Sequence, residues 1–293
     1  MPDMKTILRF TYNIVVAAFA ALLLDGCAGT AQEKEFVVYD RLAYPGKPDL
    51  TADGLSPIKL IYEAGLLTDG LIDMEKINAR IAEANEVGIK AISTDIESWY
   101  WGGKYTTEML KDSLNKVFEA FRNGIDGVNV GNYGVPIGSL NIARNVEHNI
   151  GKTDEEILAK LKSANNRLAA GEVSDVLYPS FYIYNPDVEQ WTEDLKTTVA
   201  YIKEHYPDKK IVGYIWSQYY DWKTNPYYMQ FIPEEKFLQM LDAAYEHLDG
   251  VVLWAHGRDT DNKTKVQWED ERVQAIYRAI KAFMKNHGLD KSE

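Results

Sequence analysis

The sequence lacks several features that would each point to a particular class of protein. It has a single cysteine, Cys27, which excludes an internal disulfide. The apolar run at residues 14–24 is too short to span a membrane as a helix. No G-x-G-x-x-G or phosphate-binding loop follows a predicted strand, so the usual signatures of nucleotide-binding sheets are missing. With 32 Lys and Arg against 44 Asp and Glu, the net charge of −12 argues against nucleic acid as a partner.

Metal and nucleophile signatures are missing as well. The histidines are scattered and show no spacing such as H-E-x-x-H; they are His148, His205, His247, His256 and His287. There is no G-x-S-x-G nucleophile elbow. We therefore expect neither a metal nor a cofactor.

The N-terminus carries the pattern of an export signal. Lys5 and Arg9 precede the apolar run, and Leu24-Asp25-Gly26-Cys27 resembles the cleavage box of bacterial lipoproteins, in which the cysteine is lipidated. We expect a signal peptide at residues 1–27, a tether at 28–34 and the mature domain at 35–293. The protein would then be anchored by lipid in the bacterial cell envelope, periplasmic or at the cell surface. The alternative is an ordinary secretory signal with an incidental cysteine.

The rest of the chain alternates between predicted strands and helices. The predicted strands are residues 36–40, 58–63, 91–97, 126–133, 175–184, 210–217 and 249–255. Helices are predicted at residues 73–87, 107–123, 153–171, 194–205, 233–245 and 269–285. Polar and aromatic residues follow the apolar part of each strand, as in a barrel whose site lies at the carboxyl ends of the strands. We predict a single domain with an α/β fold. The pattern favours a distorted (β/α) barrel of seven or eight strands rather than an open doubly wound sheet.

Residues 91–101, AISTDIESWYW, carry the main chemical signal. Asp95 and Glu97 are two residues apart at the end of an apolar strand, so their side chains point to the same side. Two like charges this close cannot both ionise easily, and one carboxyl should keep its proton to higher pH. We expect Glu97 to be a general acid and Asp95 to orient or stabilise part of a substrate. The alternative is a pair of solvated loop carboxylates.

Aromatic residues follow the other strands in the same way. Tyr133, Tyr182 and Trp254 each come just after an apolar segment, and Trp99, Trp216 and Tyr62 occupy similar places. Phenol hydroxyls can bond to sugar substituents and indole rings can stack on sugar faces, so these residues are candidates for substrate binding. Ordinary packing is the alternative for each one. Gln218, Tyr219, Asp221 and His256 are further candidates of the same kind.

Four ordered segments resemble the hyaluronidase family of glycoside hydrolases: D-I-E-S-W at 95–99, N-Y-G-V-P at 132–136, L-Y-P-S-F-Y at 177–182 and G-V-V-L-W at 250–254. The resemblance implies a distorted barrel that cleaves β-linked N-acetylhexosamine polymers with retention, the acetamido oxygen of the substrate being the nucleophile. It implies that Glu97 is the acid, that Asp95 orients the acetamido group, and that Tyr133, Tyr182 and Trp254 form the pocket.

The resemblance leaves alternatives open. Animal members of that family have disulfides, which this domain lacks, and a net charge of −12 is unfavourable for a polyanion, although Arg144 and Arg258 would be local exceptions. A retaining glycosidase that pairs Glu97 with a carboxylate of another strand, such as Glu63 or Asp221, is one alternative. A glycan-binding surface lipoprotein without catalysis is the other. In each case the expected partner is a glycan, and contact with the membrane is through the lipid anchor alone.

Overall fold

A computed structural model of the chain describes residues 34–100 and 105–291. The account below concerns the unit that begins at Phe36, which contains all the elements described. The predicted signal peptide, Cys27 and nearly all of the predicted tether lie outside the described residues, as does Trp101. In the described ranges, no helix combines the length and the apolar character needed to cross a bilayer.

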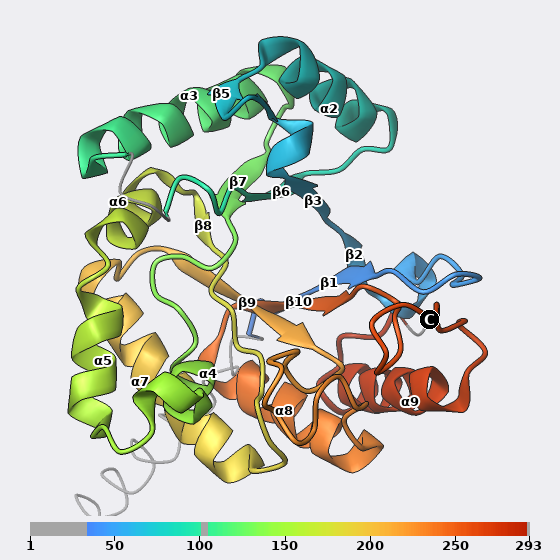
Figure 1. Cartoon of the computed structure of the whole chain (residues 1–293). Coiled ribbons are helices and arrows are strands. Elements are labelled where there is room, and N and C mark those ends of the chain that lie inside the picture. Colours follow the sequence, from blue (N-terminus) through green and yellow to red (C-terminus); the bar gives the residue numbers. More distant parts are fainter. Residues whose placement is uncertain (1–33, 101–104, 292–293) are drawn as a thin grey trace, which may run out of the picture. The chain divides into compact units, whose positions relative to one another are not determined.

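Strands and helices alternate along this unit (Figure 1). The strands are β1 Val37–Leu42, β2 Ser56–Pro57, β3 Lys59–Tyr62, β4 Leu67–Thr68, β5 Leu71–Ile72, β6 Ala91–Asp95, β7 Asn129–Asn132, β8 Val176–Leu177, β9 Lys210–Trp216 and β10 Gly250–Ala255. The helices are α2 Met74–Glu86, α3 Thr107–Gly124, α4 Leu140–Asn145, α5 Asp154–Lys162, α6 Asn165–Val173, α7 Val188–His205, α8 Glu234–His247 and α9 Glu271–Asn286. Short 3-10 turns are Thr51–Asp53, Glu63–Gly65 and Glu147–Asn149.

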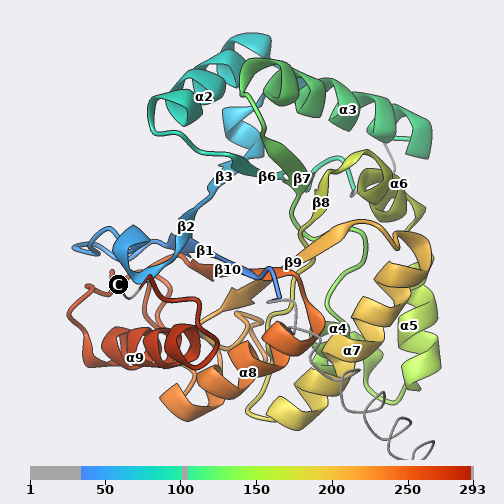
Figure 2. The ribbon, with the colours of Figure 1, turned by 180° about the vertical axis from the view of Figure 1, so that it is seen from behind.

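The parallel strands form two sheets. One has the order β2-β1-β10-β9-β8 and the other has the order β3-β6-β7. Helices α2 and α3 cover the outer side of the smaller sheet, and α7, α8 and α9 cover the larger one, as the views from both sides show (Figures 1 and 2). Helices on the outer face of a parallel sheet are what a barrel requires, because the inner faces of the strands then pack against one another and the carboxyl ends of the strands are left for the site.

The two sheets are joined at both edges. On one side the chain segment 56–62 pairs first with β1 through Ser56 and Pro57, then with β6 through β3. Pro57 has no N–H to donate, which suits the point where the segment changes partner. On the other side the backbone N–H of Asp175 donates to the carbonyl of Val130 at 2.8 Å, and that of Gly134 donates to Tyr178 at 2.9 Å. In the described part of the chain the parallel pairings therefore run round a distorted barrel.

Local sequence explains where the helices begin and what they bury. Asp73 caps α2 by accepting from the backbone N–H groups of Glu75 and Lys76. Thr153 and Glu156 form a capping box at the start of α5. One face of α3 is fully buried, and its members are Leu110, Leu114, Val117, Phe118 and Phe121. That face packs in an apolar cluster with the smaller sheet, and a second cluster fills the space between the larger sheet and its helices.

Two predicted elements differ from the structure, and one helix beside them was not predicted. The helix predicted at 153–171 is two helices, because the chain leaves helical geometry at Ser163 and Ala164 before α6 starts. Within the segment 175–184, predicted as one strand, only β8 is a regular strand. Beyond β8, isolated bridges such as Ser180 with Tyr214 continue the pairing. Helix α4 follows Ser139, whose side chain caps it, and had no prediction. These three segments surround one cavity described below.

Candidate functional site

Asp95 and Glu97 lie at the carboxyl end of β6, where the buried strand gives way to a turn. Ile96, between them, is fully buried on the opposite side in the cluster that includes α3. The Oδ1 atom of Asn132, at the end of the neighbouring β7, accepts from the hydroxyl of Thr94 at 2.7 Å and from the backbone N–H of Ile96 at 3.4 Å. The turn that presents the two carboxyls is thus held by the next strand.

Both carboxyls line a cavity of about 180 Å³ at the mouth of the barrel. Its other lining residues are Leu60, Tyr62, Tyr133, Tyr182, Tyr214, Trp216, Asp221 and Trp254. We call it the small cavity. These residues lie on or just after six strands, β3, β6, β7, β8, β9 and β10, and about two thirds of the chain separates the first from the last. The structure therefore brings together Asp95, Glu97 and the candidates Tyr62, Tyr133, Tyr182, Trp216 and Trp254.

Aromatic rings form one wall of the small cavity. Tyr182 stacks on Trp254 with ring centroids 5.7 Å apart and planes 26° from parallel. Trp216 meets Trp254 edge-on at 5.0 Å, and it is only 1% exposed, so it supports the wall from beneath. The ring centroids of Tyr133 and Tyr182 lie 6.2 Å apart. Such a wall offers flat apolar faces and a few hydroxyls, the combination that suits a sugar ring.

The enclosure of Asp95 gives it unusual protonation. Its Oδ1 atom is buried and makes no hydrogen bond with the described residues. Burial, followed by the charges of Glu97 and Glu63, raises the pKa of Asp95 to about 7. The sequence led us to expect a retained proton in this pair, with Glu97 as the acid. The structure gives the raised pKa to Asp95, because Asp95 lies deeper in the barrel while Glu97 is exposed at its mouth.

The tyrosines around Asp95 are held in their neutral form. Burial raises the pKa of Tyr133, Tyr182 and Tyr214, and the charge of Asp95 contributes to each rise. The hydroxyl of Tyr133 interacts with those of Ser180 and Tyr182. Neutral phenols keep their O–H donors, so these three tyrosines can donate hydrogen bonds to a carbonyl oxygen of a bound ligand.

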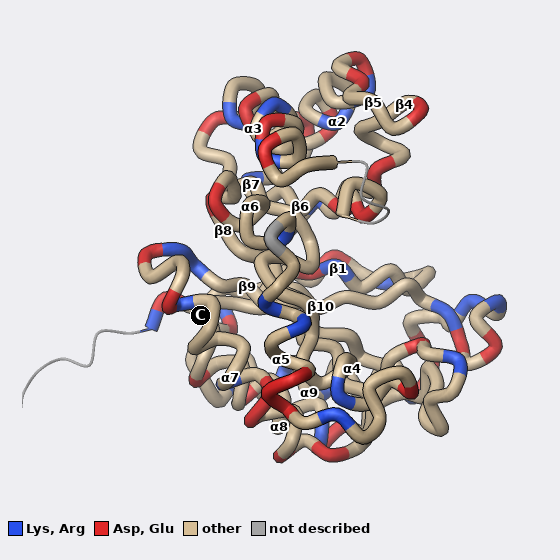
Figure 3. Tube along the Cα trace, turned by 60° about the vertical axis from the view of Figure 1, so that its left-hand side comes forward, with Lys and Arg blue, Asp and Glu red and all other residues tan. Residues whose placement is uncertain are grey.

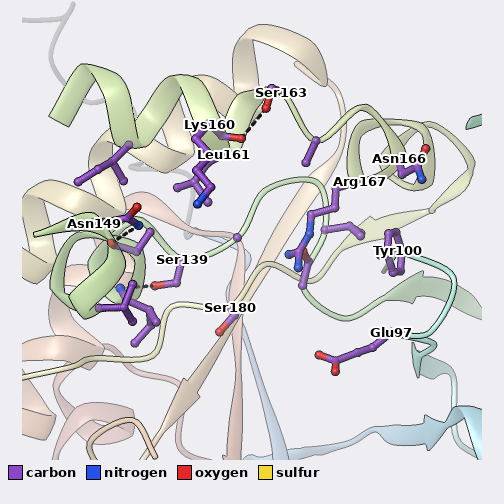
Figure 4. A pocket seen from close by; sticks show the side chains of 18 of the residues that line it. Glu97, Tyr100, Ser139, Asn149, Lys160, Leu161, Ser163, Asn166, Arg167 and Ser180 are labelled. Carbon is purple, nitrogen blue, oxygen red and sulfur yellow. Dashed lines mark hydrogen bonds between the residues drawn. The ribbon is translucent and has the colours of Figure 1, made fainter. Parts of the chain in front are cut away.

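A second, larger cavity adjoins the first. It has a volume of about 810 Å³ and shares Glu97 and Tyr133 with the small cavity. Its walls come from the loop after β7, from α4, α5 and α6, and from Ser180, Tyr220 and Trp222. Figure 4 shows Glu97 reaching in from one end, with Arg167 near the middle and Lys160 and Asn149 at the other end. Glu97 therefore stands at the boundary between the two cavities.

Arg167 is the residue of the larger cavity that the sequence signals least. Its guanidinium donates to the carbonyl of Gly134 at 2.6 Å and lies 6.0 Å from the ring centre of Tyr100. We had no prediction for it because an arginine within a helix has no distinctive pattern. The sequence did contain a signal for Ser180, because this residue belongs to the segment L-Y-P-S-F-Y.

Trp99 lies outside the lining of both cavities, and its predicted role in substrate binding stays a prediction. Its ring is 2% exposed, lies 5.4 Å from that of Tyr105, and donates from Nε1 to the carbonyl of Gly70 at 3.3 Å. The chain turns after Glu97, and this turn sends Trp99 into the apolar cluster beside α3 instead of into the barrel mouth.

Several lesser candidates also have structural roles. Gln218 is fully buried and donates to the carbonyls of Met229 and Arg258. Arg144 is bound by Asp154 and Asp194, so it is no free cation for a polyanion. His256 packs on Trp216 and Trp254, and burial lowers its pKa to about 4. Arg258 donates to the carbonyl of Asn262 within its own exposed loop.

Two carboxylates from other strands were weighed as partners of Glu97. Asp221 lines the small cavity, and burial raises its pKa. Glu63 lies outside both lining sets and accepts from the backbone N–H of Ser98 at 3.1 Å. Among the described residues, no cluster of three or more His, Cys, Asp and Glu side chains is arranged to hold a metal ion.

Comparison with solved structures identifies the fold. The structure of bee venom hyaluronidase in complex with a hyaluronic acid tetramer aligns with 87% of this chain and 98% of its own, with a TM-score of 0.50 and 14% sequence identity. The chain has the fold of the (β/α)-barrel glycoside hydrolases. At 14% identity the likeness is one of fold alone.

Two further similar structures have lower TM-scores. A putative α-L-fucosidase from Bacteroides thetaiotaomicron aligns with 88% of this chain and 97% of its own, at 8% identity and a TM-score of 0.47. An endo-β-1,4-mannanase from Thermotoga petrophila aligns with 90% of this chain and 79% of its own, at 12% identity and 0.45. No family model matches the sequence, and neither does any curated protein.

The two tryptophans Trp254 and Trp99 make a matched pair for testing the wall. Trp254→Leu is expected to raise KM for a sugar substrate by roughly tenfold, because it removes the stacked face beside Tyr182, and aromatic contacts contribute about 0.5–1.5 kcal/mol beyond the area they bury. Trp99→Leu is expected to lower the melting temperature and leave KM unchanged, because Trp99 lies in the core. Steady-state kinetics and thermal unfolding of both variants test this. Equal changes in KM would place both rings in the same role.

Proposed function

We propose that this protein is a retaining glycosidase that cleaves β-linked N-acetylhexosamine glycans in the interior of the chain. The observation that supports this most is the pairing of an enclosed carboxyl, Asp95, with an exposed carboxyl, Glu97, in a cavity of about 180 Å³ walled by Tyr133, Tyr182 and Trp254. Two carboxyls on adjacent same-side positions of one strand cannot flank a bond from both faces. They suit one acid and one orienting group.

In the proposed reaction the acetamido oxygen of the bound sugar attacks the anomeric carbon. The bond to the leaving oxygen breaks, and Glu97 gives its proton to that oxygen. Asp95 accepts a hydrogen bond from the acetamido N–H and so holds the oxygen in line, while Tyr133 and Tyr182 hold the rest of the group. Water then attacks the same carbon from the side that the leaving group vacated, the bond between that carbon and the acetamido oxygen breaks to restore the acetamido group, and Glu97 takes a proton from the water. Two inversions give net retention.

The larger cavity fits the leaving part of the substrate. A general acid must lie within hydrogen-bond reach of the oxygen that joins the two sugars. Glu97 stands between the cavities, so a sugar in the small cavity would place its leaving group in the larger one. A volume of about 810 Å³ lies in the range of sites that take ligands larger than one sugar ring. This supports endo action.

A panel of N-acetylhexosamine polysaccharides, scored for new reducing ends and for product size, tests the proposal. We expect cleavage of at least one polymer to oligosaccharides, with products that retain the β configuration when followed by NMR. Inverted products would exclude the acetamido mechanism. Lipid anchoring at Cys27 and location in the cell envelope remain proposals from the sequence.

A second mechanism is supported by Asp221. This carboxylate lines the small cavity from the loop after β9, and in a conventional retaining glycosidase it would be the nucleophile with Glu97 as acid. Such an enzyme would not need an acetamido group on its substrate. Cleavage of glycans that lack N-acetyl groups, and its loss in Asp221→Asn, would favour this mechanism over the first.

A further inference from the structure

Arg41 lies on β1, a strand that neither the sequence motifs nor the proposed mechanism use, and it is outside the lining residues of both cavities. In the parallel register its Cα pairs with Trp254 of β10, which pairs in turn with Trp216 of β9. Residues that pair in a parallel sheet have side chains on the same side. Both tryptophans line the small cavity, so Arg41 faces the barrel interior beside it.

Two further observations agree with this placement. The alternate residues of β1, Val38 and Leu42, are buried, whereas Arg41 is only half-buried. Burial raises the pKa of Tyr214, which lines the small cavity, and the positive charge of Arg41 opposes that rise. The positive charge of Arg41 therefore affects Tyr214, a residue that faces the interior of the barrel.

Arg41 differs from the other arginines in the described ranges by having no bonding partner. Each of the others has an ion pair or a hydrogen bond to a carbonyl, namely Arg80, Arg122, Arg144, Arg167, Arg258, Arg272 and Arg278. The adjacent carboxylate, Asp40, is bound instead by Lys47 and by the backbone N–H of Leu42. A half-buried positive charge loses hydration, and this cost is normally offset by a partner. At Arg41, a ligand would supply that partner.

The charges around the small cavity restrict where an anion can bind. Asp95 and Glu97 line it on the β6 side, so an anionic group there would be repelled, and Asp221 lines it from the loop after β9. The chain as a whole carries a charge of −12, and acidic residues are spread over its outer helices (Figure 3). Arg41 lies on β1, across the ring of strands from β7 and the larger cavity. An anionic group is therefore favoured at the β1–β10 wall, away from the leaving-group side.

We propose that Arg41 binds a sulfate or carboxylate group on the part of the glycan that remains in the small cavity after cleavage, and that it selects anionic over neutral substrates. The inference rests on the proposed function, because it assumes that the small cavity holds a sugar. A guanidinium presents a planar fork of donors that matches both groups in bidentate geometry. Arg41 is then a specificity residue, and it takes no part in bond cleavage.

The test compares wild type, Arg41→Gln and Arg41→Lys on three tetrasaccharides of one length. These are neutral chitotetraose, its 6-O-sulfated form and a hyaluronan tetrasaccharide, so that sulfate and carboxylate are separated. We expect Arg41→Gln to raise KM for one anionic substrate and so to lower kcat/KM on it about tenfold or more. On the neutral substrate, kcat/KM should change less than about twofold. Arg41→Lys should recover part of the loss. Arg278→Gln, remote on α9, makes the same change of net charge and should change neither value.

Binding to a cleavage-deficient protein separates this inference from the proposed function. Calorimetry with Glu97→Gln and with the double variant Glu97→Gln/Arg41→Gln measures affinity for the same three probes. If wild type cleaves them but Arg41→Gln does not change the preference for either anion, the inference is overturned and the glycosidase stands. If nothing is cleaved but an anionic probe binds in a manner that depends on Arg41, the inference stands without the enzyme. Absence of both cleavage and binding overturns both.

Discussion

Asp95→Asn is expected to slow turnover of an acetamido glycan by orders of magnitude and, at the same time, to stabilise the folded protein above pH 7. The first effect follows because an amide cannot take the place of a carboxylate that accepts the acetamido N–H and stabilises the charge that develops on the group. The second follows because the native site encloses a carboxyl whose ionised form has no hydrogen-bond partner on Oδ1. Few substitutions combine a large loss of rate with a gain in stability, so the pair of results is diagnostic.

The sign of the stability change depends on pH. Asp95 has a pKa of about 7 in the folded protein and an ordinary value near 3.8 when unfolded. Well below pH 3.8 both states are protonated and the group makes no difference. As the pH rises from about 4 to about 7, the unfolded state releases its proton first, so wild type loses stability relative to the Asn variant. Above pH 7 the difference is constant, at up to about 4 kcal/mol.

Denaturant unfolding of wild type and Asp95→Asn at pH 4, 6 and 8 measures this difference directly. We expect the two proteins to be nearly equal at pH 4 and furthest apart at pH 8. A matched control is Asp126→Asn, an exposed carboxylate in a turn before β7, for which the difference should stay small at every pH. Near-normal turnover by Asp95→Asn would exclude the acetamido-orienting role, and a difference that does not vary with pH would contradict the raised pKa.

Glu97→Gln is expected to reduce cleavage by roughly a factor of 10² to 10⁴ while leaving glycan binding intact. Glutamine has the size of glutamate but carries no proton that it can give to the leaving oxygen. Glu97 is the carboxyl shared by both cavities, so the loss should appear in kcat for substrates that occupy both. Reducing-end assays measure cleavage, and calorimetry with the same oligosaccharide measures binding.

Glu63→Gln is the matched control for Glu97→Gln. Glu63 also lies near Asp95, as its effect on the pKa of Asp95 shows, but it lines neither cavity. We expect it to change kcat less than tenfold. If Glu97→Gln keeps its activity, Glu97 is not the acid. If wild type is inactive on every acetamido glycan but binds one of them, the protein is a glycan-binding module that retains the cleft.

The sequence by itself determined much about β6 and about the helices. Side chains alternate along a strand, so the spacing of Asp95 and Glu97 places them on one side and Ile96 on the other, whatever surrounds them. The caps of α2 and α5 are equally local, because they join residues two or three positions apart. The order of strands and helices in turn predicted the barrel, since strand–helix alternation leaves few ways to cover a parallel sheet.

Only the tertiary structure decided which side chains share a cavity and which carboxyl keeps its proton. Trp254 and Trp99 each follow an apolar run, yet one stacks on Tyr182 and the other is buried beside α3, because Trp254 is part of β10 while Trp99 lies in the turn after β6. Burial is the sum of contacts from strands far apart in sequence, so the raised pKa went to Asp95. For the same reason the sequence did not indicate Arg41 as a candidate, because its lack of a bonding partner is visible only when the positions of all its neighbours are known.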